Sequence, residues 1–169
     1  TAARMPLPPV SENDSAANVI VRQKVELLEL GRKFLERIDG YQTRFIKQEM
    51  VGGELLNEQI ILLKFRRQPH SVYLRWLTEH EGREVLFVAG ANDGKLLAHD
   101  GGWRSRLPTI SLEPESSLAM NDSRYPVTKA GLSALAELII ESHIADLREN
   151  RVAACERDEN AEVEGRPCV

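Results

Sequence analysis

Residues 60–76, IILLKFRRQPHSVYLRW, decide the fold that this sequence predicts. Residues 60–65 place apolar side chains on both faces of one strand, because successive residues of a strand point to opposite sides. Pro69 has no backbone N–H for a ladder and ends that strand. In residues 71–76 apolar and more polar side chains alternate, which predicts a second strand with one dry face. A strand that is apolar on both sides must be covered on both sides. The function of the protein therefore depends on what covers the second face.

Further strands are expected on either side of this pair. Short links join them, including Gly52-Gly53, the Asn-Asp-Gly turn at residues 92–94 and Gly101-Gly102, and such tight turns favour hairpins. Strands with links this short are antiparallel, since a parallel pair needs a long crossover. The sequence therefore predicts an antiparallel meander, with strands over residues 41–51, 54–67, 71–79, 83–89, 95–100 and 103–107.

Two amphipathic helices flank the predicted strands. The first covers residues 16–38, with Asp14 or Ser15 as its N-cap and Gly40 as its C-terminal stop. The second covers residues 128–150, with Thr128 as its cap. Each helix has an apolar stripe that must lie against another surface. The prolines of residues 108–126 exclude long regular structure before the second helix.

The fold class that follows is α+β, with a curved antiparallel sheet and two amphipathic helices packed over one face. We expect a disordered or draped leader over residues 1–15, a single domain over residues 16–150 and an acidic tail over residues 151–169. The tail ends in AEVEGRPCV, which is typical of the opening of a further strand. We therefore expect that one side of the sheet lacks its continuation.

The drier parity of the strands predicts an apolar trough between sheet and helices, and the residues that would bind a ligand there. These residues are Phe45, Ile61, Leu63, Phe65, Val72, Leu74, Trp76, Val85 and Phe87. The alternative is that the helices and the curl of the sheet fill the whole interior and leave no cavity. The pattern of the residues alone leaves both open.

Composition excludes several classes of function. Hydrophobic content of 42% and charged content of 28% are ordinary for a globular domain, and no apolar run is long enough to span a bilayer. With a formal net charge of −4 and no basic block, we expect no nucleic-acid partner. The sequence has none of the catalytic or phosphate-binding motifs that we sought, and its four histidines are scattered. We therefore expect no catalytic residues, no metal and no cofactor, and no enzyme.

The two ends of the chain bear on its processing and redox state. The sequence starts without Met and without a signal peptide, at a polar, proline-containing leader, so we expect that the chain has been cut, either by a processing enzyme or by design of the expressed chain. Cys155 and Cys168 lie in the tail without ligand neighbours, which argues against zinc and leaves a disulfide open. Basic residues gather on the first strands and acidic residues in the tail, which indicates solvated faces or, alternatively, a docking asymmetry.

Several motifs resemble an uncharacterised bacterial cell-envelope family, a domain of unknown function, placed beside the LolA-like carriers of outer-membrane lipoproteins. They are K-F-R-x-x-P-x-S-V-Y-L-x-W from Lys64, G-R-E-V-L-F-V-x-G from Gly82 and S-R-Y-P-V-T from Ser123. The resemblance covers about residues 27–140. It implies a curved antiparallel half-barrel with helices over its concave side, a periplasmic or cell-envelope location, and acyl chains held between sheet and helices.

One departure from the carriers concerns gating. The carriers have an arginine directly before the proline of the second strand, whereas Gln68 stands there in this chain. Arg66 and Arg67 come earlier, and we expect them to take any gating role. The function that we expect is non-enzymatic binding of a lipid or lipoprotein acyl chain, with a membrane-surface or receptor partner. The alternative is a protein-interaction or sensor module on the same fold with a filled interior.

The long segment over residues 108–126 is expected to be a lid. Leu118 and Met120 are apolar side chains that a solvated loop does not need, so we expect them to face inward over the trough. We expect Arg124 to anchor the far end of the loop through a carboxylate or a backbone carbonyl.

Overall fold

The structure is a computed structural model that describes residues 5–11, 14–152, 154–158, 160–163 and 165–168. The chain divides into two compact units. The sheet unit comprises residues 36–134, and the helical unit comprises residues 1–35 and 135–169. The single domain expected over residues 16–150, with its helices packed on the sheet, stays a prediction.

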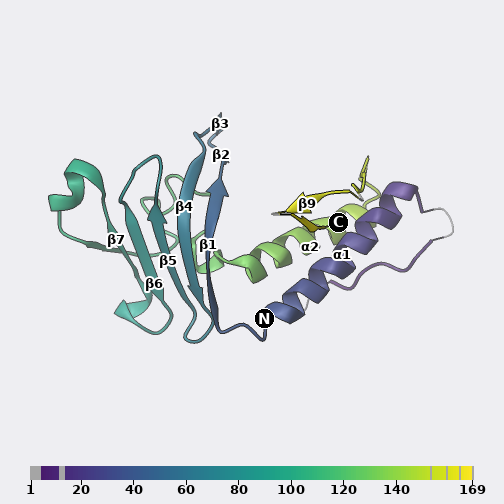
Figure 1. Cartoon of the computed structure of the whole chain (residues 1–169), viewed down its shortest axis with the longest axis horizontal. Coiled ribbons are helices and arrows are strands. Elements are labelled where there is room, and N and C mark those ends of the chain that lie inside the picture. Colours follow the sequence, from purple (N-terminus) through teal and green to yellow (C-terminus); the bar gives the residue numbers. More distant parts are fainter. Residues whose placement is uncertain (1–4, 12–13, 153, 159, 164, 169) are drawn as a thin grey trace. The chain divides into compact units, whose positions relative to one another are not determined.

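The sheet unit contains a six-stranded antiparallel sheet in the order β1-β4-β5-β6-β7-β8 (Figure 1). Its strands are β1 (Gly40–Lys47), β4 (Gln59–Arg66), β5 (Ser71–Trp76), β6 (Glu84–Val88), β7 (Leu96–His99) and β8 (Ile110–Leu112). Neighbours in space follow one another in the chain, apart from a small hairpin between β1 and β4, so the expected meander is confirmed. β1 and β8 are the two edges, and the sheet is not closed into a barrel.

The first two expected strands are each interrupted. β2 (Met50–Val51) and β3 (Glu54–Leu55) form a separate two-stranded hairpin beyond the ends of β1 and β4 (Figure 1). Gly52 and Gly53 make its turn with φ of 60° and 87°, as the glycine pair predicts.

The strand expected over residues 103–107 is wrong. The chain there forms the 3-10 helix η2 (Gly102–Arg106), and the sixth strand is β8 instead. Gly102 has a φ of +59°, which turns the chain out of the sheet direction, and the Leu107 N–H donates to the Arg104 carbonyl and closes the helical turn. Local turn geometry therefore overrides the strand propensity of an apolar residue pair. The Asn-Asp-Gly turn, η1 (Asn92–Gly94), does join β6 to β7 as expected.

The helical unit is built on α1 (Ala16–Leu35) and most of α2 (Leu132–Arg148). Val25, Ile140 and Ile144 form its buried core, with Leu7 and Leu28 packed against them. This grouping shows that the apolar stripes of the two helices bury against each other.

The helix ends differ in part from the expected ones. The Ser15 hydroxyl accepts a hydrogen bond from the Asn18 N–H at 3.2 Å, which confirms the expected cap of α1. Gly40 is not a helix stop, because α1 ends at Leu35 and Gly40 begins β1. Thr128 is not the cap of α2 either, because it lies in the 3-10 helix η3 (Val127–Lys129) that precedes α2.

The leader is draped along α1 where it is described. The Arg22 guanidinium is buried and donates to the carbonyls of Pro8 and Pro9 and to Asp14 Oδ2. Desolvation opposes ionisation of Asp14, but hydrogen bonds from Ser11 and Arg22 outweigh it and hold the pKa of Asp14 below its usual value. One arginine thus fixes the path of the residues before α1.

The tail turns back on itself. β9 (Glu162–Val163) and β10 (Arg166–Pro167) form an antiparallel pair, and the Cys168 N–H donates to the Ala161 carbonyl at 2.8 Å. The expected strand opening is therefore a local hairpin. Cys155 and Cys168 are free thiols. The acidic residues Glu159 and Glu164 lie outside the described residues.

We predict that Gly101→Ala destabilises the sheet unit. A Cβ at Gly101 would overlap the backbone of Glu81 and Gly82, which cannot move without breaking the turn between β5 and β6. Overpacking of this kind costs about 1–3 kcal/mol of unfolding free energy, measured by denaturant titration. The matched control is the exposed Ser105→Ala in η2, and an unchanged midpoint for Gly101→Ala would contradict the prediction.

We predict that His143 of α2 titrates below its usual pKa of 6.5. Burial lowers the pKa of His143, Lys24 lowers it further, and Asp146 opposes both. The unfolded chain then binds the proton more tightly than the fold, so stability falls as the pH drops through 6.5. Imidazole chemical shifts measure the pKa, which Lys24→Gln should raise. A His143 midpoint at or above 6.5 would refute this.

Candidate functional site

The register of the sheet brings all nine residues predicted for ligand binding onto one face. Residues paired directly across neighbouring strands share a face of the sheet. The pairs are Phe45↔Ile61, Ile61↔Trp76, Leu63↔Leu74, Phe65↔Val72, Val72↔Phe87 and Leu74↔Val85. We call these nine residues the apolar face. The opposite face of the sheet carries the alternate residues of the same strands, including Lys64, Arg66 and Arg75.

The apolar face is buried at its centre and open at one margin. Ile61, Leu63 and Val72 are almost fully buried, whereas Phe45 on the edge strand β1 leaves 38% of its surface exposed. The next residue, Ile46, is 62% exposed on the opposite face. The centre of the apolar face therefore has a cover, and Phe45 marks where that cover ends.

Within the sheet unit, residues 113–131 provide part of this cover, and we call them the covering loop. Gly131, with a φ of +120°, lies so close to the Phe65 ring that a Cβ would come within 3.0 Å of two ring carbons. The Tyr41 hydroxyl accepts a hydrogen bond from the Leu132 N–H at 2.6 Å, just after the loop. Burial raises the pKa of Tyr41, so this hydroxyl stays neutral across the physiological range.

A buried lysine fastens the middle of the covering loop. The Lys47 side chain is only 7% exposed, and its Nζ donates to the Asp122 carbonyl and, at 2.7 Å, to Ser123 Oγ. Glu49 Oε1 lies 3.6 Å from the same Nζ, and Glu49 Oε2 accepts the Arg124 N–H at 2.7 Å. The ammonium group thus has three oxygen partners, which a buried charge needs.

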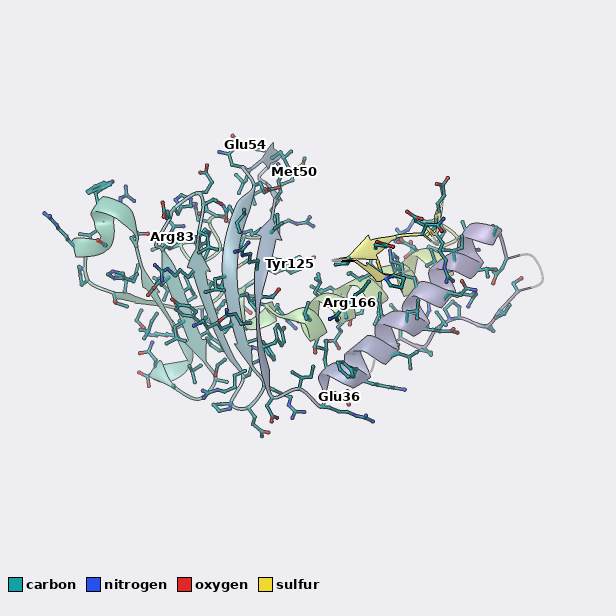
Figure 2. All side chains as sticks on the ribbon, viewed as in Figure 1. Glu36, Met50, Glu54, Arg83, Tyr125 and Arg166 are labelled. Carbon is teal, nitrogen blue, oxygen red and sulfur yellow. The ribbon has the colours of Figure 1, made fainter. Side chains whose placement is uncertain are left out.

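Arg83 makes the second tie to the loop, and Figure 2 labels it. Its Nη1 lies 3.2 Å from Asp122 Oδ2, its Nε lies 3.1 Å from Asp100 Oδ1, and its guanidinium carbon lies 5.8 Å from the centroid of the Trp76 ring. The Trp76 indole N–H in turn donates to Gln59 Oε1 at 2.9 Å. A polar cluster therefore closes this end of the apolar face.

Aromatic rings line the other end of the apolar face. Tyr41 stacks on Phe65 with 5.0 Å between centroids, and His70 meets the Phe65 and Phe87 rings edge-on at 5.4 and 6.1 Å. Nε2 of His70 is buried and has no hydrogen-bond partner among the described residues. The two ends of the same face thus differ, one polar and ionic, the other aromatic.

The residues expected to form the lid lie on the covering loop. Leu118 is 63% exposed, although we expected it to face inward, and Met120 is half-buried. Arg124 does meet a carboxylate, but through its backbone N–H to Glu49, while its guanidinium lies 5.9 Å from the centroid of the Tyr125 ring. The movement of the loop as a lid stays a prediction.

The two arginines expected to gate the trough are tied to neighbouring turns. Arg66 pairs with Gly40 and Ser71 in the register, so it faces away from the apolar face, and its Nη2 donates to Ser71 Oγ at 3.1 Å. Arg67 donates to the Glu36 carbonyl and to Asp39 Oδ1. The Arg66 contact joins the end of β4 to the start of β5, and the Arg67 contacts join the turn after β4 to the residues before β1. A gating role for either arginine stays a prediction.

Sequence reasoning missed the polar residues that close the apolar face. Lys47 and Gln59 stand two residues from Phe45 and Ile61, on the same parity of their strands. The sequence did contain a signal for them, namely a polar residue at a position where the alternation of the strand places side chains on the apolar face. Asp122, by contrast, lies in an irregular loop, where no periodicity could have indicated it.

The sheet unit and the helical unit each contain a hollow. One of about 370 Å³ is lined by Arg75, Trp76, Leu77, Glu81, Gly82 and Gly102, so Trp76 alone of the nine predicted residues reaches it. The other, of about 450 Å³, is in the helical unit and is lined by Met5, Pro6, Leu7, Val25, Glu26, Glu29, Leu30, Lys33 and Ile144. The second is the more apolar and is of a size that ligand pockets commonly have.

The described part of the chain offers no group of three or more His, Cys, Asp or Glu side chains that could hold a metal ion. In the same part, neither helix combines the length and the apolar composition that crossing a membrane requires.

These features define an α+β protein with an open antiparallel meander whose apolar face is closed by a tethered loop. The chain belongs to a family described as "Protein of unknown function (DUF1571)", whose model matches residues 38–169. This confirms the expected relation to an uncharacterised domain. Searches of curated proteins and of solved structures found no match.

We predict that Lys47→Met loosens the covering loop and destabilises the sheet unit. The substitution leaves the Asp122 carbonyl and the Glu49 carboxylate without their cation, which costs ~2 kcal/mol of unfolding free energy. Hydrogen exchange should also show faster exchange of the Arg124 amide, which donates to Glu49.

The matched control is Lys64→Met, because Lys64 is exposed on the opposite face. Its effect should stay within about 0.5 kcal/mol. Equal unfolding midpoints for the two variants would show that Lys47 does not hold the loop.

Proposed function

We propose that this chain is a non-enzymatic cell-envelope protein that binds an apolar ligand, a lipid or the acyl chain of a lipoprotein, against the apolar face. In this proposal the sheet is a LolA-like half-barrel, the two helices cover its apolar face, and the protein works in the periplasm or at the envelope. The observation that supports it most is the register, which aligns nine apolar and aromatic residues on one face.

In this proposal the covering loop acts as a lid over the apolar face. Its ties to the sheet are polar and sit at Lys47, Glu49 and Arg83, so opening it exchanges hydrogen bonds for bonds to water. Each such bond contributes about 0.5–1.5 kcal/mol net, whereas each buried methylene contributes about 0.8 kcal/mol. A ligand that buries a handful of methylenes would therefore offset the cost of opening.

A second apolar surface supports the proposal from the helical unit. Leu27, Leu30 and Phe34 follow helical spacing along α1 and are all exposed. Leu30 also lines the 450 Å³ hollow. An acyl chain held between helices and sheet requires an unfilled apolar stripe of this kind on the helices.

The second candidate is a protein-interaction or sensor module with a filled interior. It is favoured by the burial of Ile61, Leu63 and Val72, and by the close approach of Gly131 to Phe65. In that case the polar ties fix the loop permanently, and the exposed surfaces carry the function.

A pair of adjacent substitutions on β1 tests the choice. Phe45→Glu places a charge at the open margin of the apolar face, and Ile46→Glu places the same charge on the opposite face. If an acyl chain binds the apolar face, Phe45→Glu should weaken binding of a fluorescent fatty acid by tenfold or more (about 1.4 kcal/mol), because the chain must then lie against a charge.

Ile46→Glu should bind the same probe as the unchanged protein does. Both residues are partly exposed, so circular dichroism should show both variants folded. Absence of saturable probe binding to the unchanged protein would remove the ligand proposal and leave the interaction module, as would equal affinities of the two variants.

A further inference from the structure

The 3-10 helix η2 presents the most exposed tryptophan of the chain. Trp103 leaves 82% of its surface exposed, while the other tryptophan, Trp76, leaves 8%. Leu107, directly after η2, is also exposed. An indole in water is unusual, because tryptophan buries more apolar area than almost any other side chain.

The base of η2 is fixed, so this exposure belongs to the fold. Gly101 packs directly on the backbone of Glu81 and Gly82, and Asp100 is held by Arg83 at 3.1 Å. The Leu107 N–H closes the turn by donating to the Arg104 carbonyl. Trp103 therefore projects from a short turn on a well-anchored base.

Cationic side chains accompany this tryptophan. Arg104 lies with its guanidinium carbon 5.1 Å from the centroid of the Trp103 ring, and Arg106 follows two residues later. Among the residues that the structure describes, neither guanidinium forms an ion pair with a carboxylate. An indole beside free arginines matches the boundary between lipid headgroups and acyl chains, where aromatic rings and snorkelling cations both lie favourably.

The direction of the strands places a second apolar tip at the same end of the sheet. β1, β5 and β7 run in one direction, so the β2–β3 hairpin after β1 and η2 after β7 both extend beyond that end (Figure 1). Met50 and Leu55 are exposed on this hairpin, and Figure 2 shows Met50 and Glu54 near its tip. Two separate tips at one end suit contact with an extended surface.

We propose that η2 docks this protein on an anionic lipid surface, with Trp103 and Leu107 inserted at the headgroup level and Arg104 and Arg106 on the lipid phosphates. A stable protein interface buries about 1,200–2,000 Å². One convex turn cannot supply that area, whereas interfacial membrane anchors act residue by residue. The acidic Glu79 and Glu81 keep the neighbouring turn out of the lipid, so insertion of η2 is shallow. The inference is independent of the proposed apolar ligand.

Tryptophan fluorescence and co-sedimentation with vesicles test this docking. Vesicles of phosphatidylcholine with phosphatidylglycerol should shift the emission of the full chain to the blue and sediment it, and vesicles of phosphatidylcholine alone should do so much less. Because Trp76 is buried, the shift should come from Trp103, and Trp103→Ser should lose both shift and sedimentation. The double variant Arg104→Gln/Arg106→Gln should bind the anionic vesicles at least about tenfold more weakly than the unchanged protein. Added salt should also weaken binding of the unchanged protein, because it screens the attraction between the arginines and the lipid phosphates.

Three results would overturn the proposal. The first is unchanged emission when anionic vesicles are added, and the second is equal sedimentation of Trp103→Ser and the unchanged protein. The third is a dimer in sedimentation equilibrium that Trp103→Ser abolishes, which would assign η2 to self-association. Trp103 and both arginines are exposed, so unchanged thermal unfolding should verify that the variants fold.

Discussion

The ammonium group of Lys47 is the contact on which the closed side of the sheet depends. It sits at the end of β1 on the apolar parity, where a charge has no water to solvate it. Three oxygens, from Asp122, Ser123 and Glu49, replace that water, and two of them belong to the covering loop. A buried cation is tolerable only with such partners, so the need to satisfy Lys47 also positions the loop.

This arrangement ties the two candidate functions to one physical balance. The centre of the apolar face is already buried. What separates a carrier from a filled module is whether the gain from burying ligand methylenes exceeds the cost of releasing the loop. The exposed apolar stripe of α1 favours the carrier function, whereas the tight fit of Gly131 on Phe65 favours the filled module.

The end of the sheet that carries the polar cluster also carries η2. Arg83 connects the two, because it pairs with Asp122 of the covering loop and with Asp100 just before η2. The hollow lined by Trp76 and Gly102 lies at the same end. A lipid surface contacted by Trp103 would thus lie beside the contact between Arg83 and Asp122 that holds the covering loop.

The sequence by itself determined the secondary-structure order, the antiparallel meander and the apolar parity. These are local or periodic properties: alternation along residues 71–76, the glycine pair at residues 52–53 and the Asn-Asp-Gly turn each specify the backbone within a few residues. The same locality explains the failures. The strand expected over residues 103–107 is the 3-10 helix η2, because Gly102, with a φ of +59°, turns the chain out of the sheet direction, and strand propensity does not register such a turn.

Only the tertiary structure decided how the apolar face is closed. Lys47 and Asp122 are 75 residues apart, and nothing in either neighbourhood indicates the other. The nine residues predicted for ligand binding could be assigned to one face, because parity is a property of each strand. The loop partners of Lys47 and Arg83 could not be assigned, because a polar side chain in an irregular loop acquires its partner only when the chain folds back on itself.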